Sequence, residues 1–186
     1  MINSIRPTTR DAIIDAAFAV FSKDPSAALS EVATLAGVGR ATLHRHFASR
    51  EELIRQLAKI ANEEMDQAVE AACADVASYS EAARLSLQAL IPLGDRFGFL
   101  ELEPLEDDPD LKSAYDRQKR ETEEMAEAAK GEGLIDPAVP TSWVVQAYDH
   151  LLYAGWESVK AGETTPEQAA DLAWRTLTTG LGTPRK

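Results

Sequence analysis

The chain has 186 residues but only one cysteine, Cys73, and it has no long apolar run. A single cysteine excludes an intrachain disulfide and any zinc site that needs several cysteines. We interpret Cys73 as a small buried apolar residue, the alternative being a redox switch across a dimer. A membrane span needs roughly 18 consecutive apolar residues, and Met1–Arg10 lacks the apolar core of a signal peptide. The sequence therefore predicts a cytoplasmic protein with no membrane partner.

Positive charge is scarce, with 19 Lys and Arg against 31 Asp and Glu and a formal net charge of −12. An even spread of such charge would argue against a nucleic-acid partner. However, residues 1–60 carry eight basic and six acidic side chains, a balance of +2. The other 126 residues carry eleven basic and twenty-five acidic side chains, a balance of −14. Only the N-terminal part therefore suits a phosphate backbone, and the acidic remainder would be repelled by one.

The usual sequence motifs of catalysis and cofactor binding are also missing. We find no phosphate-binding loop, no zinc motif and no nucleophile flanked by glycines, and the Asp and Glu pairs are typical of solvated helix faces. His44 and His46 suggest a metal site only weakly, because residues two apart on a helix point to different faces. We predict no enzymatic activity, no cofactor and no bound metal.

Apolar residues recur at helical spacing along most of the chain, and no segment alternates as a strand would. Thr8 or Thr9 is a suitable cap for a first helix, Ser30 for a second, and Ser49 with Glu52 forms a capping box. The helix that begins at Ser49 would be roughly 40 Å long if it lasts to residue 74, enough to join two domains. The pattern predicts an all-α protein with helices ending near residues 22, 36, 47, 74, 91, 130, 160 and 181, and an irregular stretch over residues 94–110.

Three residues in the N-terminal part have the spacing of a helix-turn-helix. Ala33, Gly37 and Leu43 supply a small residue for close helix crossing, a turn glycine and an apolar anchor. The segment around them, LSEVATLAGVGRATLHRHFASREELIRQL at residues 29–57, resembles the signature of the TetR family of regulators. In that signature Ala-Gly-Val leads into a short recognition helix, followed by an aromatic-rich end and a Ser-Lys-Glu helix start.

The resemblance implies an all-helical homodimer with a three-helix DNA-binding domain, here residues 1–55, and an effector-binding and dimerisation domain, here residues 56–186. It also implies which side chains contact DNA. Those expected in the major groove are Arg40, Ala41, Thr42 and Arg45, and those expected at phosphates are Ser30, His44, His46 and Arg50. The sequence departs from the family pattern at Gly39, where serine is usual, at His44, where tyrosine is usual, and at Arg50, where lysine is usual.

A second group of residues in the acidic part predicts a ligand pocket. One face of the helix from Pro109 combines apolar residues with an uncharged amide and hydroxyl, and buried polar groups need partners. The predicted effector-binding residues are Phe97, Phe99, Tyr115, Gln118, Thr122, Met125, Trp143, Ala147 and His150. The alternative is that these residues form a filled core or a dimer face without ligand.

The last two helices carry many small residues, which allow close helix crossing. The resemblance implies that they form a four-helix dimer interface, and the alternative is that they only close the core of one protomer. The predicted interface residues are Val144, Tyr148, Leu151, Leu152, Gly155, Val159, Ala169, Leu172, Ala173 and Leu177.

These features together predict a DNA-binding transcriptional regulator. Its expected form is a homodimeric repressor that binds a near-palindromic operator and is released by a small, largely apolar effector. Effector binding would move the long helix that begins near Arg50. The alternative is a helix-turn-helix protein without a small-molecule effector, controlled by a protein partner or by abundance. The sequence leaves activation of transcription open as well.

Overall fold

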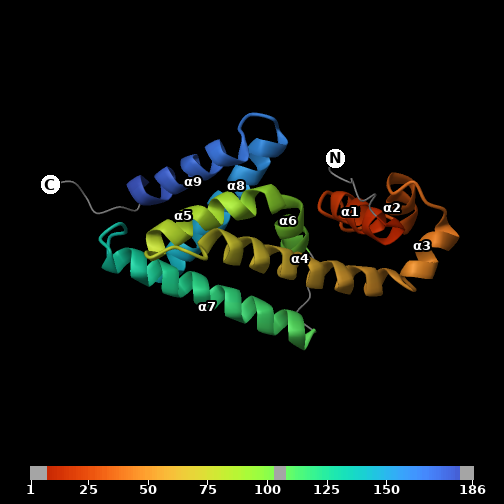
Figure 1. Ribbon diagram of the computed structural model, residues 1–186, viewed down its shortest axis with the longest axis horizontal. Helices are drawn as coiled ribbons and strands as arrows, with labels where there is room; N and C mark the ends of the chain where they lie inside the picture. Colours follow the sequence, from red (N-terminus) through yellow and green to blue (C-terminus); the bar gives the residue numbers. More distant parts are fainter. Residues whose placement is uncertain (1–7, 103–107, 181–186) are drawn as a thin grey trace. The chain divides into compact units, whose positions relative to one another are not determined.

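The computed structural model describes residues 8–102 and 108–180, without the side chains of residues 97, 101 and 102. The regular secondary structure in these ranges is helical (Figure 1). This result confirms the predicted all-α fold class. None of the described helices is both long enough and apolar enough to cross a membrane.

The described residues pack into two compact units. Unit 1 contains those within Met1–Asn62 and Asp95–Asp107, and unit 2 contains those within Glu63–Gly94 and Asp108–Lys186. The long helix α4, Arg50–Cys73, belongs to both units. These units differ from the predicted domains 1–55 and 56–186, because the crossing lies within α4 and the chain returns to unit 1 after Gly94.

Unit 1 begins with three short helices, which are α1 (Thr9–Phe21), α2 (Leu29–Leu35) and α3 (Arg40–His46). Thr8 caps α1 as predicted, because its hydroxyl accepts a hydrogen bond from the Asp11 N–H at 3.2 Å. The Asp11 carboxylate accepts one from the Thr8 N–H at 3.0 Å, and these bonds lower the pKa of Asp11. The largest fully buried side chains of unit 1 are Ile13, Phe18, Phe21, Val32, Leu43, Phe47, Leu53, Leu57 and Phe99.

Two helix starts differ in detail from the sequence prediction. The N-cap of α2 is Ala28 instead of Ser30, and the Glu31 carboxylate accepts a hydrogen bond from the Ala28 N–H at 3.1 Å. At the start of α4 the Ser49 hydroxyl accepts a hydrogen bond from the Glu52 N–H at 3.2 Å, as predicted. The Glu52 carboxylate, however, accepts its bond from the Ala48 N–H at 2.8 Å.

The stretch predicted to be irregular contains a helix, α6, which spans Gly94–Leu102. Most of α6 belongs to unit 1, where the buried ring of Phe99 packs edge-on against Phe18 with 5.5 Å between ring centroids. The Arg96 guanidinium lies 4.5 Å from the Phe18 ring centroid and 3.2 Å from the Asp15 carboxylate. The sequence prediction was wrong here because two glycines weaken local helix propensity, whereas the stabilising partners lie about 80 residues earlier in the chain.

Unit 2 is built from the C-terminal half of α4 and a set of helices that follow it. These are α5 (Tyr79–Leu90), the 3-10 helix η1 (Ile91–Leu93), α7 (Pro109–Gly131), α8 (Thr141–Lys160) and α9 (Pro166–Gly180). The helices α8 and α9 pack as a hairpin (Figure 1). The 3-10 helix η1 packs against both of them. Gly155 allows η1 to approach α8 closely, because a Cβ there would lie 2.7 Å from Ile91 Cδ1 and would force that side chain to shift.

Candidate nucleic-acid interface and ligand cavity

The helix-turn-helix has the geometry that its spacing predicts. Ala33 and Leu43 are buried where α2 meets α3, and Gly37 adopts a φ of 67°, in the left-handed region that favours glycine. The Val38 N–H then donates a hydrogen bond to the Ala33 carbonyl at 2.9 Å, which closes the turn. The two helices are thereby fixed to each other by backbone contacts and by buried apolar side chains.

The helix α3 has one buried side chain, Leu43, which anchors it to the core of unit 1. Its other residues are the predicted DNA contacts. Arg40, Ala41, His44 and Arg45 are exposed, while Thr42 and His46 are half-buried. In the part of the chain that the structure describes, no group of three or more His, Cys, Asp or Glu side chains converges as metal ligands would. The arrangement therefore presents a short, polar and basic helix on a rigid apolar base.

Of the two remaining predicted phosphate contacts, Ser30 is exposed on α2, whereas Arg50 is engaged inside unit 1. The Arg50 guanidinium donates hydrogen bonds to the carbonyls of Ala27, at 2.7 Å, and of Pro25. It also lies over the Phe21 ring, 4.4 Å from the centroid. These contacts tie the loop between α1 and α2 to the start of α4. A phosphate bound by Arg50 would have to share the guanidinium with these two carbonyls.

Unit 2 contains a small cavity with about 20 Å³ of free space. The lining residues come from α5, α7, α8 and α9 and from the segment after α7, and none of them is charged. They are Ala83, Thr122, Met125, Ala126, Ala129, Ile135, Val144, Val145, Tyr148, Trp174 and Leu177. The predicted effector-binding set contributes Thr122 and Met125 to this lining. This free space holds about one water molecule and is far below the roughly 300 to 1,000 Å³ of small-molecule sites, so the lining side chains largely fill the cavity and a ligand would have to displace them.

The other predicted effector-binding residues lie elsewhere. Phe99 is buried in unit 1, and the side chain of Phe97 lies outside the described residues. Tyr115 and Trp143 are 63% and 62% exposed. Ala147 and His150 line an open groove between α8 and α9, and Gln118 contacts α4. The periodicity of α7 and α8 identified a common face on each helix but could not indicate which face a neighbouring helix covers.

The predicted dimer residues divide into two groups. Seven are buried within one protomer, namely Val144, Tyr148, Leu152, Gly155, Ala169, Ala173 and Leu177. Leu151 and Val159 are half-buried, and Leu172 is 43% exposed. For the seven buried residues the structure favours the alternative that they close the core of the protomer. Three of them, Val144, Tyr148 and Leu177, line the cavity.

One buried polar group borders the cavity. The Tyr148 hydroxyl donates a hydrogen bond to the Ala83 carbonyl at 3.1 Å. Burial raises the pKa of this phenol, so it stays neutral and remains a donor at ordinary pH. With its hydroxyl already bonded to α5, Tyr148 offers the cavity mainly its ring. The lining therefore matches apolar or aromatic surface, and it has few groups for recognising a strongly polar ligand.

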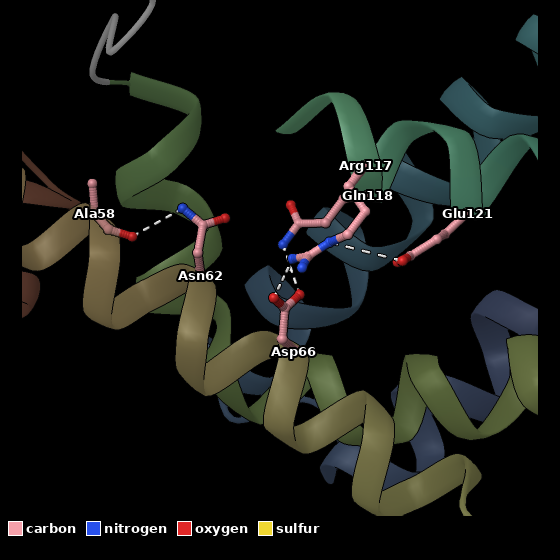
Figure 2. A network of polar contacts seen from close by, with 6 residues as sticks. All are labelled: Ala58, Asn62, Asp66, Arg117, Gln118 and Glu121. Atoms are coloured by element: carbon pink, nitrogen blue, oxygen red, sulfur yellow. Dashed lines mark hydrogen bonds and ion pairs between the residues drawn. The ribbon is translucent and has the colours of Figure 1, made fainter. Parts of the chain in front are cut away.

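A polar network joins α7 to the C-terminal half of α4 (Figure 2). The Asp66 carboxylate accepts a hydrogen bond from the Gln118 amide at 3.0 Å and pairs with the Arg117 guanidinium. We call Asp66, Arg117 and Gln118 the α4–α7 clamp. The cavity-lining Thr122 lies one turn further along α7, where its hydroxyl donates to the Gln118 carbonyl at 2.9 Å. The clamp thus connects the cavity wall directly to the helix that continues into unit 1.

Comparison with known proteins gives consistent results. Residues 13–57 match the model of the bacterial regulatory proteins of the tetR family. The chain is 33% identical over 177 residues to the HTH-type transcriptional repressor LfrR of Mycolicibacterium smegmatis. The aligned region covers 95% of this chain and 92% of LfrR.

Solved structures agree with this similarity. The crystal structure of LfrR from Mycobacterium smegmatis in complex with proflavine has a TM-score of 0.73 and 32% identity, covering 95% of this chain and 97% of that one. The ketosteroid transcriptional regulator KstR2 of Mycobacterium tuberculosis has a TM-score of 0.78 over 99% of this chain and 98% of its own, but its 17% identity supports the fold alone. Because it has this helix-turn-helix and is similar to LfrR over nearly its whole length, this chain belongs to the TetR family of DNA-binding transcriptional regulators, which are not enzymes.

Proposed function

We propose that this regulator is a homodimeric repressor that a small, flat and largely apolar ligand releases from its operator. The observation that carries the proposal is the exposed basic helix α3 in a chain that resembles a transcriptional repressor along 95% of its length. Two such helices about one DNA turn apart, roughly 34 Å, would read a near-palindromic site. Selection of bound duplexes from a random pool tests this part, and a single half-site as the product would contradict the dimeric form.

The ligand class follows from the cavity of unit 2 and from the relative. The cavity has an uncharged, partly aromatic lining, and residues 61–186 carry a net charge of −14. LfrR has been crystallised with proflavine, a planar aromatic cation. A flat ring system with a delocalised positive charge suits both an apolar lining and the field of an acidic surrounding. We therefore infer that the effector of this chain is of the same chemical class.

Binding of proflavine to the protein tests the proposed effector class. The measurement uses protein without DNA, because proflavine also intercalates into DNA. We expect the melting temperature of the protein to rise. We also expect the fluorescence of proflavine to change and to saturate at one ligand per cavity. The control is Ala126→Leu, which fills the cavity from its buried wall while leaving α3 untouched. Equal binding by the parent and by this variant would argue against the cavity. Failure of diverse planar apolar and cationic ligands to stabilise the parent would favour a regulator controlled by a protein partner or by abundance.

The dimer would form through the outward face of the α8–α9 hairpin. This face carries the exposed Trp143, His150 and Ala154 of α8 and the partly exposed Leu172 of α9, beside the groove between the two helices. It contains small and apolar side chains that one protomer leaves uncovered, as a packed four-helix interface requires. Of the residues that the sequence predicted, Leu151 and Leu172 lie where they could take part.

Ala154→Glu should convert the protein from a dimer to a monomer, because it buries two carboxylates in the centre of the proposed interface. Ser142→Glu is the matched control, since residue 142 is also exposed on α8 but points about a third of a turn away. Sedimentation at micromolar concentration measures the outcome. We expect Ala154→Glu to raise the dimer dissociation constant at least a hundredfold and Ser142→Glu to leave it unchanged. A dimer that tolerates Ala154→Glu would place the interface elsewhere.

The α4–α7 clamp is the proposed route from the cavity to the DNA-binding unit. A ligand against Thr122 and Met125 would displace α7, and the pairing of Asp66 with Arg117 and Gln118 would pass that displacement to α4 (Figure 2). Because α4 continues into unit 1, where Leu53 and Leu57 are buried, its movement would change how α3 is presented.

Asp66→Asn should weaken the response to ligand more than it weakens DNA binding itself. The amide keeps an acceptor for Gln118 but loses the charge that holds Arg117. Allosteric coupling is typically about 5-fold to 150-fold in affinity, and we expect this variant to reduce it roughly fivefold. The measurement is the ratio of operator dissociation constants with and without proflavine, corrected for intercalation with the Ala126→Leu protein. The control is Lys112→Gln, whose ion pair with Asp116 stays within α7, and an unchanged ratio in Asp66→Asn would exclude the clamp.

A further inference from the structure

The guanidinium of Arg10, in the first turn of α1, lies beside the end of α3. Its guanidinium carbon lies 5.6 Å from the centroid of the Phe47 ring, and its Nη2 donates a hydrogen bond to the Gln56 side-chain carbonyl at 3.4 Å. Phe47 is buried and is the C-cap residue that follows α3. Two contacts from two other elements of unit 1 therefore fix the direction of a long side chain that would otherwise be mobile.

The charge of Arg10 remains available to an outside anion. The neighbouring carboxylate, Asp11, is turned towards the backbone N–H of Thr8 and caps α1. The ion pairs of the described residues do not include Arg10, and its side chain is exposed. A guanidinium has five N–H donors, and the bond to Gln56 occupies one of them. The other four N–H donors are therefore left for an anion in front of α1, although the Arg10 charge also acts on the nearby Asp11 carboxylate.

The end of a recognition helix is where DNA phosphates are to be expected. A helix with its side chains is about 10 to 12 Å in diameter, so a helix such as α3 would nearly fill a major groove that is roughly 12 Å wide. A cation attached to the cap of a helix in that groove therefore lies at its edge, where the phosphate backbone runs. The last turn of α3 adds further basic groups there, namely His44, Arg45 and His46.

We propose that Arg10 is a DNA-phosphate contact outside the helix-turn-helix, held ready for DNA by Phe47 and Gln56. This inference rests on the proposed operator binding, and it adds a contact that residues 29–57 do not contain. A phosphate contact positions the protein on the duplex and carries no sequence information. The loss of Arg10 should therefore weaken binding to operator and to unrelated DNA by the same factor.

The test compares Arg10→Gln, which keeps a polar side chain beside Gln56, with Arg10→Lys, which keeps the charge. Binding to selected operator and to unrelated duplex is measured from 50 to 300 mM salt. Each phosphate contributes about 0.9 to the slope of log K against log salt, so a dimer that loses two contacts should lose about 1.8. The same relation gives a loss of roughly thirtyfold in affinity at 0.15 M salt. Arg10→Lys should keep the parent slope, as should the control Lys23→Gln, which removes an exposed cation just beyond the other end of α1.

Two outcomes would overturn the Arg10 assignment while leaving the proposed function intact. One is a parent-like slope and affinity in Arg10→Gln. The other is an unchanged slope together with a lower melting temperature, which would make Arg10 a packing residue that supports Phe47. Absence of DNA binding by the parent chain at every salt concentration would overturn the proposed function as well as this contact.

Discussion

Phe99→Ala should lower the free energy of unfolding by about 3 to 5 kcal/mol, the usual cost of removing a buried aromatic ring. Phe99 is completely buried, and its ring packs edge-on against Phe18 of α1. The substitution removes that contact and leaves a cavity under α6, which the neighbouring helices can fill only in part. At roughly 2 to 4 °C per kcal/mol for a chain of this size, the melting temperature should fall by about 6 to 20 °C.

Urea unfolding of the parent, Phe99→Ala and Leu100→Ala at one protein concentration measures the effect, because the proposed dimerisation would make apparent stability depend on concentration. Leu100 is the matched control, since it is the next residue of α6 but only half-buried. We expect it to cost clearly less than Phe99. Equal and small losses in the two variants would mean that α6 is not part of the core of unit 1.

The helix-turn-helix could be predicted from sequence because its determinants are local. Ala33, Gly37 and Leu43 lie within eleven consecutive residues, and each has a single physical task in the turn. A backbone φ of 67° favours glycine in any protein, so a glycine at this position indicates the turn without any knowledge of the rest of the chain. The same holds for the cap at Thr8, whose partner Asp11 is three residues away.

The ligand cavity could be predicted only in part, because it depends on which face of each helix is covered. The stripe on α7 that joins Tyr115 to Met125 is continuous in sequence, but Tyr115 is 63% exposed whereas Met125 lines the cavity. Similarly, the small residues of α8 mark close packing, and the sequence cannot show whether the partner is η1 in the same protomer or a second protomer. For Gly155 the structure gives Ile91 of η1 as that partner.

Helix α6 could not be predicted from sequence, because the contacts that stabilise it are even more distant in the chain. Arg96 and Phe99 contact Asp15 and Phe18, which are about 80 residues earlier in the chain. No periodicity within residues 94–102 encodes that pairing, and the glycines in this segment lower its intrinsic helix propensity. Tertiary packing therefore determines the helix, which is why the substitution at Phe99 is expected to have a large effect.

Arg45→Ala should weaken operator binding at least thirtyfold while leaving the fold and the proposed dimer unchanged. Arg45 is exposed on α3, on the side opposite the buried Leu43, and it shares that side with the exposed Ala41 one turn earlier. An arginine that bonds guanine O6 and N7 contributes about 1 to 3 kcal/mol of discrimination, and a dimer loses two such contacts, hence about 2 kcal/mol at the least. Because the side chain is solvated in the free protein, removing it should leave the melting temperature within about 1 °C.

The two possible roles of Arg45, base contact and phosphate contact, are separated by Arg45→Lys and by unrelated DNA. Lysine restores the charge but cannot reproduce the planar bidentate fork, so it should recover non-specific binding without recovering preference for the operator. A gel shift at 0.15 M salt with operator and unrelated duplexes measures both affinities. If Arg45→Lys restores the operator affinity completely, Arg45 acts through its charge at a phosphate. Recognition of the operator bases would then depend on the exposed residues at the start of α3, Arg40 and Ala41, together with Thr42.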